Sequence, residues 1–239
     1  MNTYESTYGN NTAANALPEE RARFIRKTYL HLAAAILAFV ALEGYLFISG
    51  IANSIISVMS IGGTMSWLLV LGAFMGVSML AGWWANSQTS KVMQYLGLLL
   101  YTVAEAVIFV PLLFKISNFT SNPFDVIAKA GIVTLGLFLG ITSVVFLTRS
   151  DFSFLGPILA IGGFVALGFI VASVIFGFSL GSIFAFVMVA FAGTAILYET
   201  SNVLHRYNTN QHVAASLTLF ASIALLFWYI LTIFGSSDD

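Results

Sequence analysis

Seven long apolar segments are the feature that most constrains how this chain can fold. A helix of about 20 apolar residues crosses the hydrocarbon core of a bilayer, and each segment reaches that length. Lipid offers no partner for backbone N–H and C=O groups, so segments of this kind must be helical. We therefore predict an all-α membrane protein with seven transmembrane helices. The segments are residues 28–49, 64–84, 92–114, 128–147, 154–176, 181–204 and 213–234.

The amino-acid composition excludes a water-soluble domain. Hydrophobic residues make up 59% of the 239 residues and charged residues only 8%, whereas soluble domains carry roughly 25% charged residues. The net charge of −1 gives no electrostatic basis for binding nucleic acid. The chain has no cysteine, which excludes disulfides and thiolate metal sites.

The polar parts of the chain lie at its two ends and in one longer connection. Residues 1–17 are rich in Asn, Thr, Ser and Ala, and we expect them to be disordered. Pro18 begins a short helix with acids in its first turn, as the helix dipole favours. The region 50–63 is either a loop or an extension of the second span. The predicted divisions are residues 1–27 as a polar cytoplasmic tail with a short interfacial helix, 28–235 as the transmembrane domain and 236–239 as a short acidic tail.

Basic residues predict which side of the membrane each connection faces. Seven of them precede the first span or follow spans two, four and six, and two lie in the alternate connections. Cytoplasmic connections carry the excess of Lys and Arg, so we expect a cytoplasmic N-terminus and an external C-terminus. This arrangement needs an odd number of spans, which favours seven over six. The larger group is Arg21, Arg23, Arg26, Lys27, Lys91, Arg149 and Arg206, and the smaller is Lys115 and Lys129.

Two small-residue patterns predict close helix contacts. Gly72 and Gly76, and likewise Gly136 and Gly140, are spaced four residues apart, a spacing that lets membrane helices approach each other. We expect these contacts to lie within the bundle rather than between two copies of the chain. The protein is accordingly expected to be a monomer.

Three acids lie well inside the apolar segments and are candidate functional residues. Glu43, Glu105 and Glu199 belong to the first, third and sixth spans. A charged carboxylate at the centre of a span costs about 2.5–3.5 kcal/mol or more, so it usually faces the protein interior. Two interpretations stay open. Each acid is either protonated and hydrogen-bonded to a neighbouring helix, or it belongs to a cation pathway.

Polar residues recur on the helix faces that carry these acids. On spans that are otherwise apolar, such stripes indicate a polar interior. From the helix rise, Glu43 and Glu105 lie roughly 20 Å from the cytoplasmic side and Glu199 within roughly 8 Å of it. Because these spans carry acids while the basic residues lie near span ends, that interior would favour cations. The stripes are Glu199 with Asn202 and Arg206, Glu105 with Tyr95 and Thr102, and Thr218 with Ser222 and Tyr229; the candidate pathway comprises Glu43, Thr102, Glu105 and Thr218.

Signals for enzyme chemistry are weak. Residues 177–181 match a G-x-S-x-G pattern, but they lie between two spans rather than between a strand and a helix. The chain has no H-E-x-x-H, and its last span has no lysine for a Schiff base. We expect no enzymatic activity and no cofactor, apart from Ca²⁺ as a transported or bound ion.

Four stretches of the sequence are distinctive: Arg-Lys-Thr-Tyr at 26–29, Thr-Arg-Ser-Asp-Phe-Ser-Phe-Leu-Gly at 148–156, Ile-Leu-Tyr-Glu-Thr-Ser-Asn at 196–202 and Trp-Tyr-Ile-Leu-Thr-Ile-Phe-Gly at 228–235. Together they resemble the Bax inhibitor-1 family, and within it the bacterial YccA-like branch. The similarity extends from about residue 21 to residue 235. It implies six helices that surround a hydrophobic seventh.

The resemblance also implies a site. In calcium-leak members, aspartates on spans six and seven pair near the cytoplasmic side as a pH-sensitive gate. Glu199 matches the first aspartate, and an ungapped alignment through the end of the last span puts Ser222 at the second. A Glu beside a Ser cannot share a proton as two carboxylates do. Arg206 or His205 would have to replace the arginine latch of some members, and Glu105 is similar to the family's acidic third span.

Two functions follow from the residues and the resemblance. The first is a pH-sensitive cation leak, for calcium, with an ion or pH site at Glu199, Asn202, Arg206 and Ser222 and a weak metal ligand in Glu199. The alternative is a non-transporting modulator of a membrane-bound AAA protease of the FtsH type, with residues 1–17 as a handle for a cytoplasmic partner. Both place the chain in a bacterial inner membrane.

Overall fold

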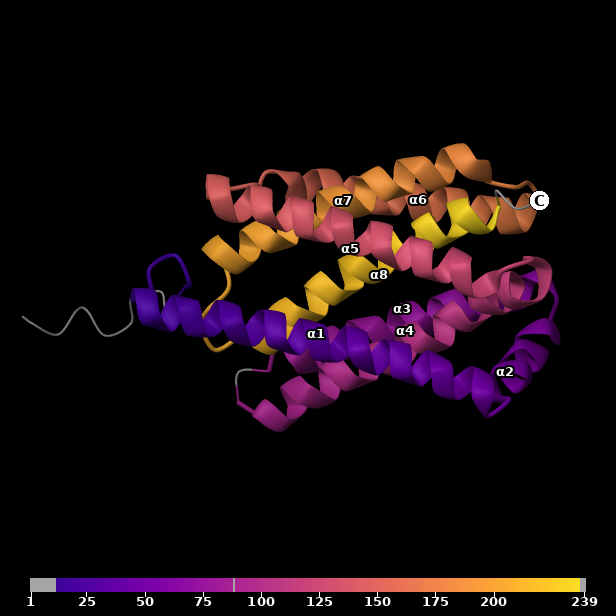
Figure 1. The fold of residues 1–239 in the computed structure, drawn as a ribbon, viewed down its shortest axis with the longest axis horizontal. Coiled ribbons are helices and arrows are strands. Elements are labelled where there is room, and N and C mark those ends of the chain that lie inside the picture. Colours follow the sequence, from indigo (N-terminus) through magenta and orange to yellow (C-terminus); the bar gives the residue numbers. More distant parts are fainter. Residues whose placement is uncertain (1–11, 88, 237–239) are drawn as a thin grey trace, which may run out of the picture.

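The computed structural model describes residues 12–87 and 89–236, and this part of the chain forms eight helices (Figure 1). Seven of these helices are long and apolar enough to cross a membrane, which confirms the predicted number of spans. The start of α1, the end of α4 and the start of α5 extend five or more residues beyond the predicted segments, and the other ends agree within one residue. The helices are α1 (Pro18–Ile48), α2 (Ile51–Ser60), α3 (Thr64–Ala85), α4 (Lys91–Phe119), α5 (Pro123–Thr148), α6 (Leu155–Phe176), α7 (Gly181–His205) and α8 (His212–Gly235).

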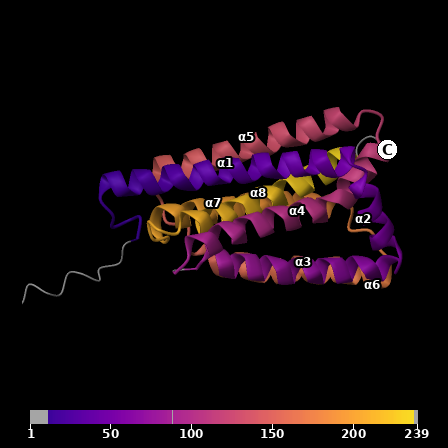
Figure 2. The same cartoon turned by 90° about the horizontal axis from the view of Figure 1, so that it is seen from below.

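The bundle has three layers, with α8 at its centre (Figure 2). Helices α4, α7 and α8 form the middle layer, α1 and α5 cover one face, and α3 and α6 lie on the other. Helix α8 packs against α1, α3, α4, α5 and α7. Ala166 of α6 and Tyr229 of α8 share a small buried cluster, which completes the ring. The predicted arrangement of six helices around a hydrophobic seventh is thus confirmed.

Local sequence explains where several helices begin. Pro18 and Pro123 occupy the first turns of α1 and α5, where a missing N–H costs nothing and the fixed φ suits a helix. Ser90 caps α4, because its hydroxyl accepts a hydrogen bond from the Met93 N–H at 3.2 Å. Helix α1 runs without interruption from Pro18, so the predicted interfacial helix and the first span are one element of 31 residues.

The region 50–63 is neither a loop nor a continuation of the second span. It contains the separate short helix α2, bounded by glycines on both sides. Gly50 has φ 79° and Gly63 has φ 62°, and only glycine adopts this left-handed region at little cost. The chain therefore turns at both positions and crosses the end of the bundle between α1 and α3 (Figure 2).

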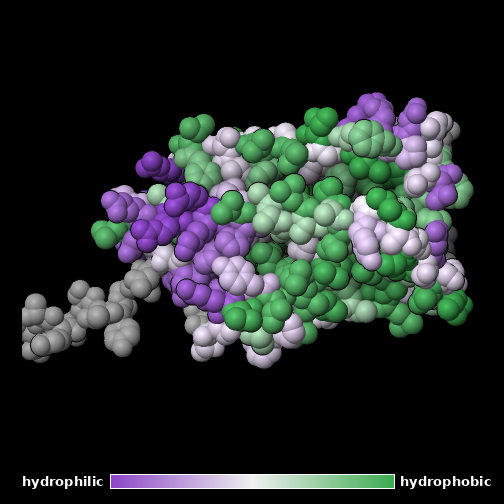
Figure 3. Space-filling model, turned by 60° about the horizontal axis from the view of Figure 1, so that its bottom comes forward, coloured by the Kyte–Doolittle hydropathy of each residue, from purple (hydrophilic) through white to green (hydrophobic). Residues whose placement is uncertain are grey.

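The outer surface matches a lipid environment. Apolar side chains cover the middle of the face drawn in Figure 3, and hydrophilic side chains gather at its two ends. Leu69, Phe164 and Ile183 are among the large apolar residues that point outward. Since lipid replaces water around such a belt, these side chains need no cover from protein. The protein is a multi-pass integral membrane protein.

The two predicted glycine contacts are wrong. Gly72, Gly76, Gly136 and Gly140 are exposed, and nothing outside their own helices lies within 4 Å of a Cβ built on any of them. The close contact occurs at Gly97 of α4 instead. A Cβ there would lie 2.5 Å from the Ala81 carbonyl oxygen and 2.6 Å from the Ala85 nitrogen, both backbone atoms of α3. Spacing alone does not reveal which glycines face a neighbour.

Substitution at Gly97 should therefore destabilise the bundle. Gly97→Ala forces α3 and α4 apart and should lower stability by about 1–3 kcal/mol, seen as a lower Tm of purified protein in detergent. Gly72→Ala is the matched control, because its Cβ meets open space and alanine favours the helix. Equal Tm values for Gly97→Ala and the parent would contradict the α3–α4 contact.

Candidate functional site

Three of the four stretches that carry the family resemblance, residues 26–29, 148–156 and 196–202, pack near the end of the bundle that holds the α7–α8 connection, whereas residues 228–235 form the opposite end of α8. The Phe152 N–H donates to Ser201 Oγ at 2.9 Å and joins the α5–α6 connection to α7. Gly156 lies against the ring of Tyr198, and a Cβ there would be 3.1 Å from the Tyr198 Oη. The stretches at 148–156 and 196–202, which are at least 40 residues apart in the sequence, are thus in direct contact.

The first stretch, at the start of α1, reaches the same region. The Tyr29 hydroxyl lies beside the hydroxyls of Thr142 and Thr200, although none of the three makes a hydrogen bond of normal geometry with the residues described. The Ser216 hydroxyl of α8 donates to the Thr28 carbonyl at 2.8 Å. Helices α1, α5, α7 and α8 therefore meet through small polar groups, as membrane helices commonly do.

Glu199 is half-buried on α7 and faces polar groups from α7, α8 and their connection. Asn202 Nδ2 donates to Glu199 Oε2 over a long 3.4 Å. The Thr218 hydroxyl of α8 is directed toward the same carboxylate. Tyr207 Oη lies 3.1 Å from Thr218 Oγ1, within hydrogen-bonding distance. We call Glu199, Asn202, Tyr207 and Thr218 the Glu199 cluster.

The structure places Thr218, rather than Ser222, opposite Glu199. Ser222 lies one helical turn deeper on α8, and its hydroxyl donates to the Thr218 carbonyl at 3.0 Å. The ungapped alignment places the second position on α8, and the antiparallel packing of α7 and α8 sets the level at which side chains meet. Thr218 is therefore the residue of α8 that acts as the polar partner of Glu199.

Tyr207 remains a hydrogen-bond donor over the physiological pH range. Burial, and next the nearby Glu199 carboxylate, raise the pKa of the Tyr207 phenol above its ordinary value. Its hydroxyl is consequently protonated near Glu199. Tyr207 lies in the short connection between two spans, where the sequence carries no signal that it turns toward an acid.

Neither basic candidate pairs with Glu199. Arg206 is exposed, and the described residues contain no ion pair between it and Glu199. The pKa of Asp151 is held below its usual range first by the Ser153 N–H and further by the charges of His205 and Arg206, so both side chains lie near that acid. His205 Nδ1 also lies 3.0 Å from the Ser201 carbonyl.

Residues 12–16, which we call the N-terminal clasp, cover the connection that carries Tyr207. The Ala13 N–H donates to the Tyr207 carbonyl at 2.9 Å, and Ala13 is fully buried. Arg21 Nε donates to the Ala13 carbonyl at 2.6 Å, and the guanidinium also bonds the Ala14 carbonyl. The expected disorder thus does not extend to residues 12–17, and residues 1–11 lie outside the described part.

Removal of the Arg21 side chain should release the clasp. Arg21→Ala deletes both hydrogen bonds from the guanidinium, so the Ala13 N–H should exchange with deuterium at least about tenfold faster, since charged hydrogen bonds contribute about 1.5–3 kcal/mol. Hydrogen-exchange mass spectrometry of the N-terminal peptide measures the rate. The exposed Arg23 provides the control variant Arg23→Ala. Unchanged exchange in Arg21→Ala would contradict this role.

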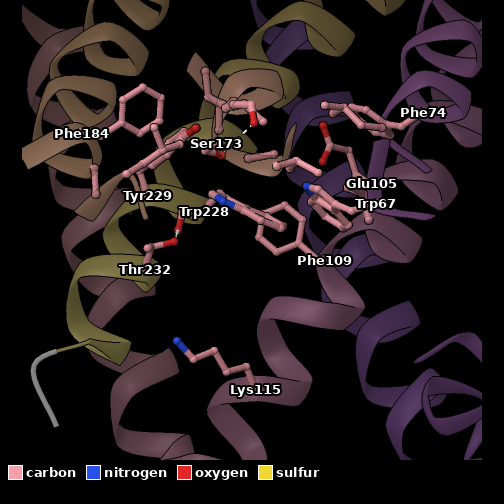
Figure 4. A pocket seen from close by; sticks show the side chains of 18 of the residues that line it. Trp67, Phe74, Glu105, Phe109, Lys115, Ser173, Phe184, Trp228, Tyr229 and Thr232 are labelled. Atoms are coloured by element: carbon pink, nitrogen blue, oxygen red, sulfur yellow. Dashed lines mark hydrogen bonds between the residues drawn. The ribbon is translucent and has the colours of Figure 1, made fainter. Parts of the chain in front are cut away.

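Glu105 lines a cavity of about 780 Å³ between α3, α4, α6, α7 and α8. Tyr101 Oη donates to Glu105 Oε1 at 2.7 Å, and both side chains are buried. Figure 4 shows Glu105 beside Trp67 and Phe74, and Lys115 apart from them. Lys115 lies near the end of α4 that points away from the clasp, so the cavity extends from that end of the bundle to its middle.

Ser222 lines the same cavity as Glu105. The predicted polar stripe on α8 therefore runs from Thr218 in the Glu199 cluster, through Ser222, to Tyr229 in the cavity lining. The stripe on α4 is less complete. Thr102 is buried but donates to its own helix at the Leu98 carbonyl, and Tyr95 is exposed and stacks on His31.

Glu43 is separate from both sites. It is buried on α1, and neither carboxylate oxygen has a hydrogen-bond partner among the described residues. It does not line the cavity, and no described contact joins it to the Glu199 cluster. Glu105 of α4 and Glu199 of α7 thus lie beside different levels of α8, with Ser222 and Thr218 of α8 between them. Glu43 lies apart from this row.

A family model described as "Inhibitor of apoptosis-promoting Bax1" matches residues 21–239. The chain belongs to the Bax inhibitor-1 family. Bax inhibitor 1 of Schizosaccharomyces pombe is 31% identical over 222 residues, which cover 90% of this chain and 77% of the yeast protein. The resemblance inferred from the motifs is confirmed.

Two bacterial proteins match parts of this Bax inhibitor-1 chain. An uncharacterized protein of Pseudomonas aeruginosa is 37% identical over 123 residues, covering 49% of the chain and 54% of that protein. The modulator of FtsH protease YccA of Escherichia coli is 36% identical over 112 residues, covering 46% of the chain and 51% of YccA. The chain thus spans about half the length of these bacterial relatives.

Proposed function

We propose that the protein is a cation leak whose route follows α8 between the Glu105 cavity and the Glu199 cluster. One observation carries the proposal: Ser222 lines the cavity that contains Glu105, and it lies one turn from the Thr218 that faces Glu199. Two acids from different helices are thereby joined by hydroxyl groups. Polar residues of this kind inside a membrane bundle commonly mark ion pathways.

Charge and coordination both favour weak cation passage. The route has acids in its interior, and among the residues that the structure describes Lys115 is the only basic one in the cavity lining. The described residues contain no cluster of three or more His, Asp or Glu side chains that could hold a metal ion. Conduction needs sites that attract an ion without retaining it, so single acids separated by hydroxyls suit a leak of Ca²⁺ or another small cation.

Protonation of Glu199 should control this leak. The ionised carboxylate attracts a cation and the neutral acid does not, so flux through the parent protein should rise as the pH rises. Glu199→Gln should lower Ca²⁺ flux at high pH by about tenfold and remove its pH dependence. Calcium flux into liposomes at several pH values measures both effects.

Matched variants separate the route from the rest of the bundle. Glu105→Gln should lower flux as Glu199→Gln does, because both acids lie on one route. Glu43→Gln should leave flux unchanged, since Glu43 is a buried acid outside the route. Equal flux from Glu199→Gln and the parent would exclude the gating role, and no flux from the parent would exclude the leak.

A second function is supported by the name of the YccA relative, which is a modulator of FtsH protease. We propose as the alternative that this chain restrains a membrane-bound AAA protease of the FtsH type in a bacterial inner membrane, with a cytoplasmic N-terminus. The handle would be the N-terminal tail, residues 1–17, of which the clasp at residues 12–16 lies against the α7–α8 connection.

Copurification tests this alternative. The full chain in a gentle detergent should recover the protease, and deletion of residues 2–11 should reduce recovery without altering Ca²⁺ flux. The control deletes residues 237–239 at the opposite end of the chain. Failure to recover the protease, together with unchanged protease activity after the N-terminal deletion, would exclude the modulator.

A further inference from the structure

Aromatic rings surround the inner part of the Glu105 cavity. The rings of Trp67 and Trp228 are stacked with centroids 6.4 Å apart, and Phe109 meets Trp228 edge-on at 5.0 Å. These side chains and Phe74 come from α3, α4 and α8 and line the cavity with Glu105 (Figure 4). The cavity is therefore an apolar chamber with one interior carboxylate.

The Glu105 carboxylate is only partly satisfied. Its Oε1 accepts the Tyr101 hydroxyl. Its Oε2 makes no hydrogen bond to the residues described. This oxygen is not fully buried, and because Glu105 lines the cavity, Oε2 is accessible from it. A carboxylate in apolar surroundings is costly without a positive partner. The chamber thus has an acceptor that is open to a ligand.

The lining suits an organic cation better than a bare metal ion. Calcium takes six to eight oxygen ligands, whereas Glu105, Tyr101 and Ser222 supply few. An organic cation is weakly hydrated and is attracted both to a carboxylate and to the faces of Trp and Tyr rings. The volume of about 780 Å³ also matches sites for drug-sized molecules, which measure roughly 300–1,000 Å³.

We propose that this cavity binds a hydrophobic organic cation, with its charge beside Glu105 and its apolar body against Trp67 and Trp228. Lys115, the other charged residue of the lining, is exposed and ten positions further along α4, about 15 Å from Glu105 along the helix axis. It lies near the mouth in contact with water, so no described basic side chain lies beside Glu105 in the inner chamber. The site does not depend on the proposed leak, because binding requires no transport.

Two isosteric ions of opposite charge test the proposal. Equilibrium binding of tetraphenylphosphonium and tetraphenylborate is measured on the purified full chain in detergent. The cation should bind to one site at least about tenfold more tightly than the anion. Equal affinities, or tighter binding of the anion, would overturn the proposal.

Variants locate the site. Glu105→Gln should weaken cation binding by about tenfold, and Trp228→Ala should weaken it too. Glu43→Gln should match the parent, because it removes a buried acid that does not line the cavity. Lys115→Ala should retain cation binding. Loss of binding in Lys115→Ala, retention in Glu105→Gln, or equal loss in Glu43→Gln would each overturn the site.

Two further measurements distinguish a loss of binding from a loss of folding and from a loss of transport. Each variant is compared by its Tm in detergent, and Tyr101→Phe, which removes only the hydroxyl bonded to Glu105, should retain the preference for the cation even if Glu105→Gln fails to fold. Loss of that preference in a folded Tyr101→Phe would count against the site. Cation binding without Ca²⁺ flux would support the binding site and exclude the leak. Ca²⁺ flux without cation binding would support the leak and exclude the binding site.

Discussion

Helix α8 packs against α1, α3, α4, α5 and α7, and this central packing positions those helices. Some of its contacts use small or hydroxylated side chains. Ala215 and Ser216 are fully buried within it. Lipid is as apolar as leucine, so helices in a membrane associate by close fit and hydrogen bonds rather than by hydrophobic burial. Small side chains at these two positions let the neighbouring helices approach α8 closely there. The Ser216 bond to the Thr28 carbonyl shows the same principle in one contact.

The same helix decides which polar groups can act together. Thr218 faces Glu199 at one end of the bundle, and Ser222 reaches the Glu105 cavity one turn further on. Without α8 between them, the two acids would belong to unrelated helices. Glu43 illustrates the contrast, because it is also a buried acid but lies on α1, away from the α8 stripe. The physical location of a carboxylate, more than its presence in a span, determines what it can do.

Sequence patterns predicted the residues of the candidate site better than their partners. The three acids were visible because a carboxylate is rare and costly in an apolar segment. Their neighbours were not, because a helix presents several faces and only packing selects one. Gly72 and Gly136 have the spacing of packing glycines yet face outward, while Gly97, which has no such partner, contacts the α3 backbone. Tyr207 and the tryptophans of the cavity were missed for the same reason.

The sequence by itself determined the seven spans, the membrane environment, the family and the identity of the three interior acids. These follow from local properties: segment length, the cost of charge in lipid and short motifs. Only the tertiary structure decided that Thr218 rather than Ser222 faces Glu199, that Glu105 opens into an aromatic chamber and that the clasp covers the α7–α8 connection. Each of these depends on the rotation and level of one helix against another, which nonlocal packing sets and no single segment encodes.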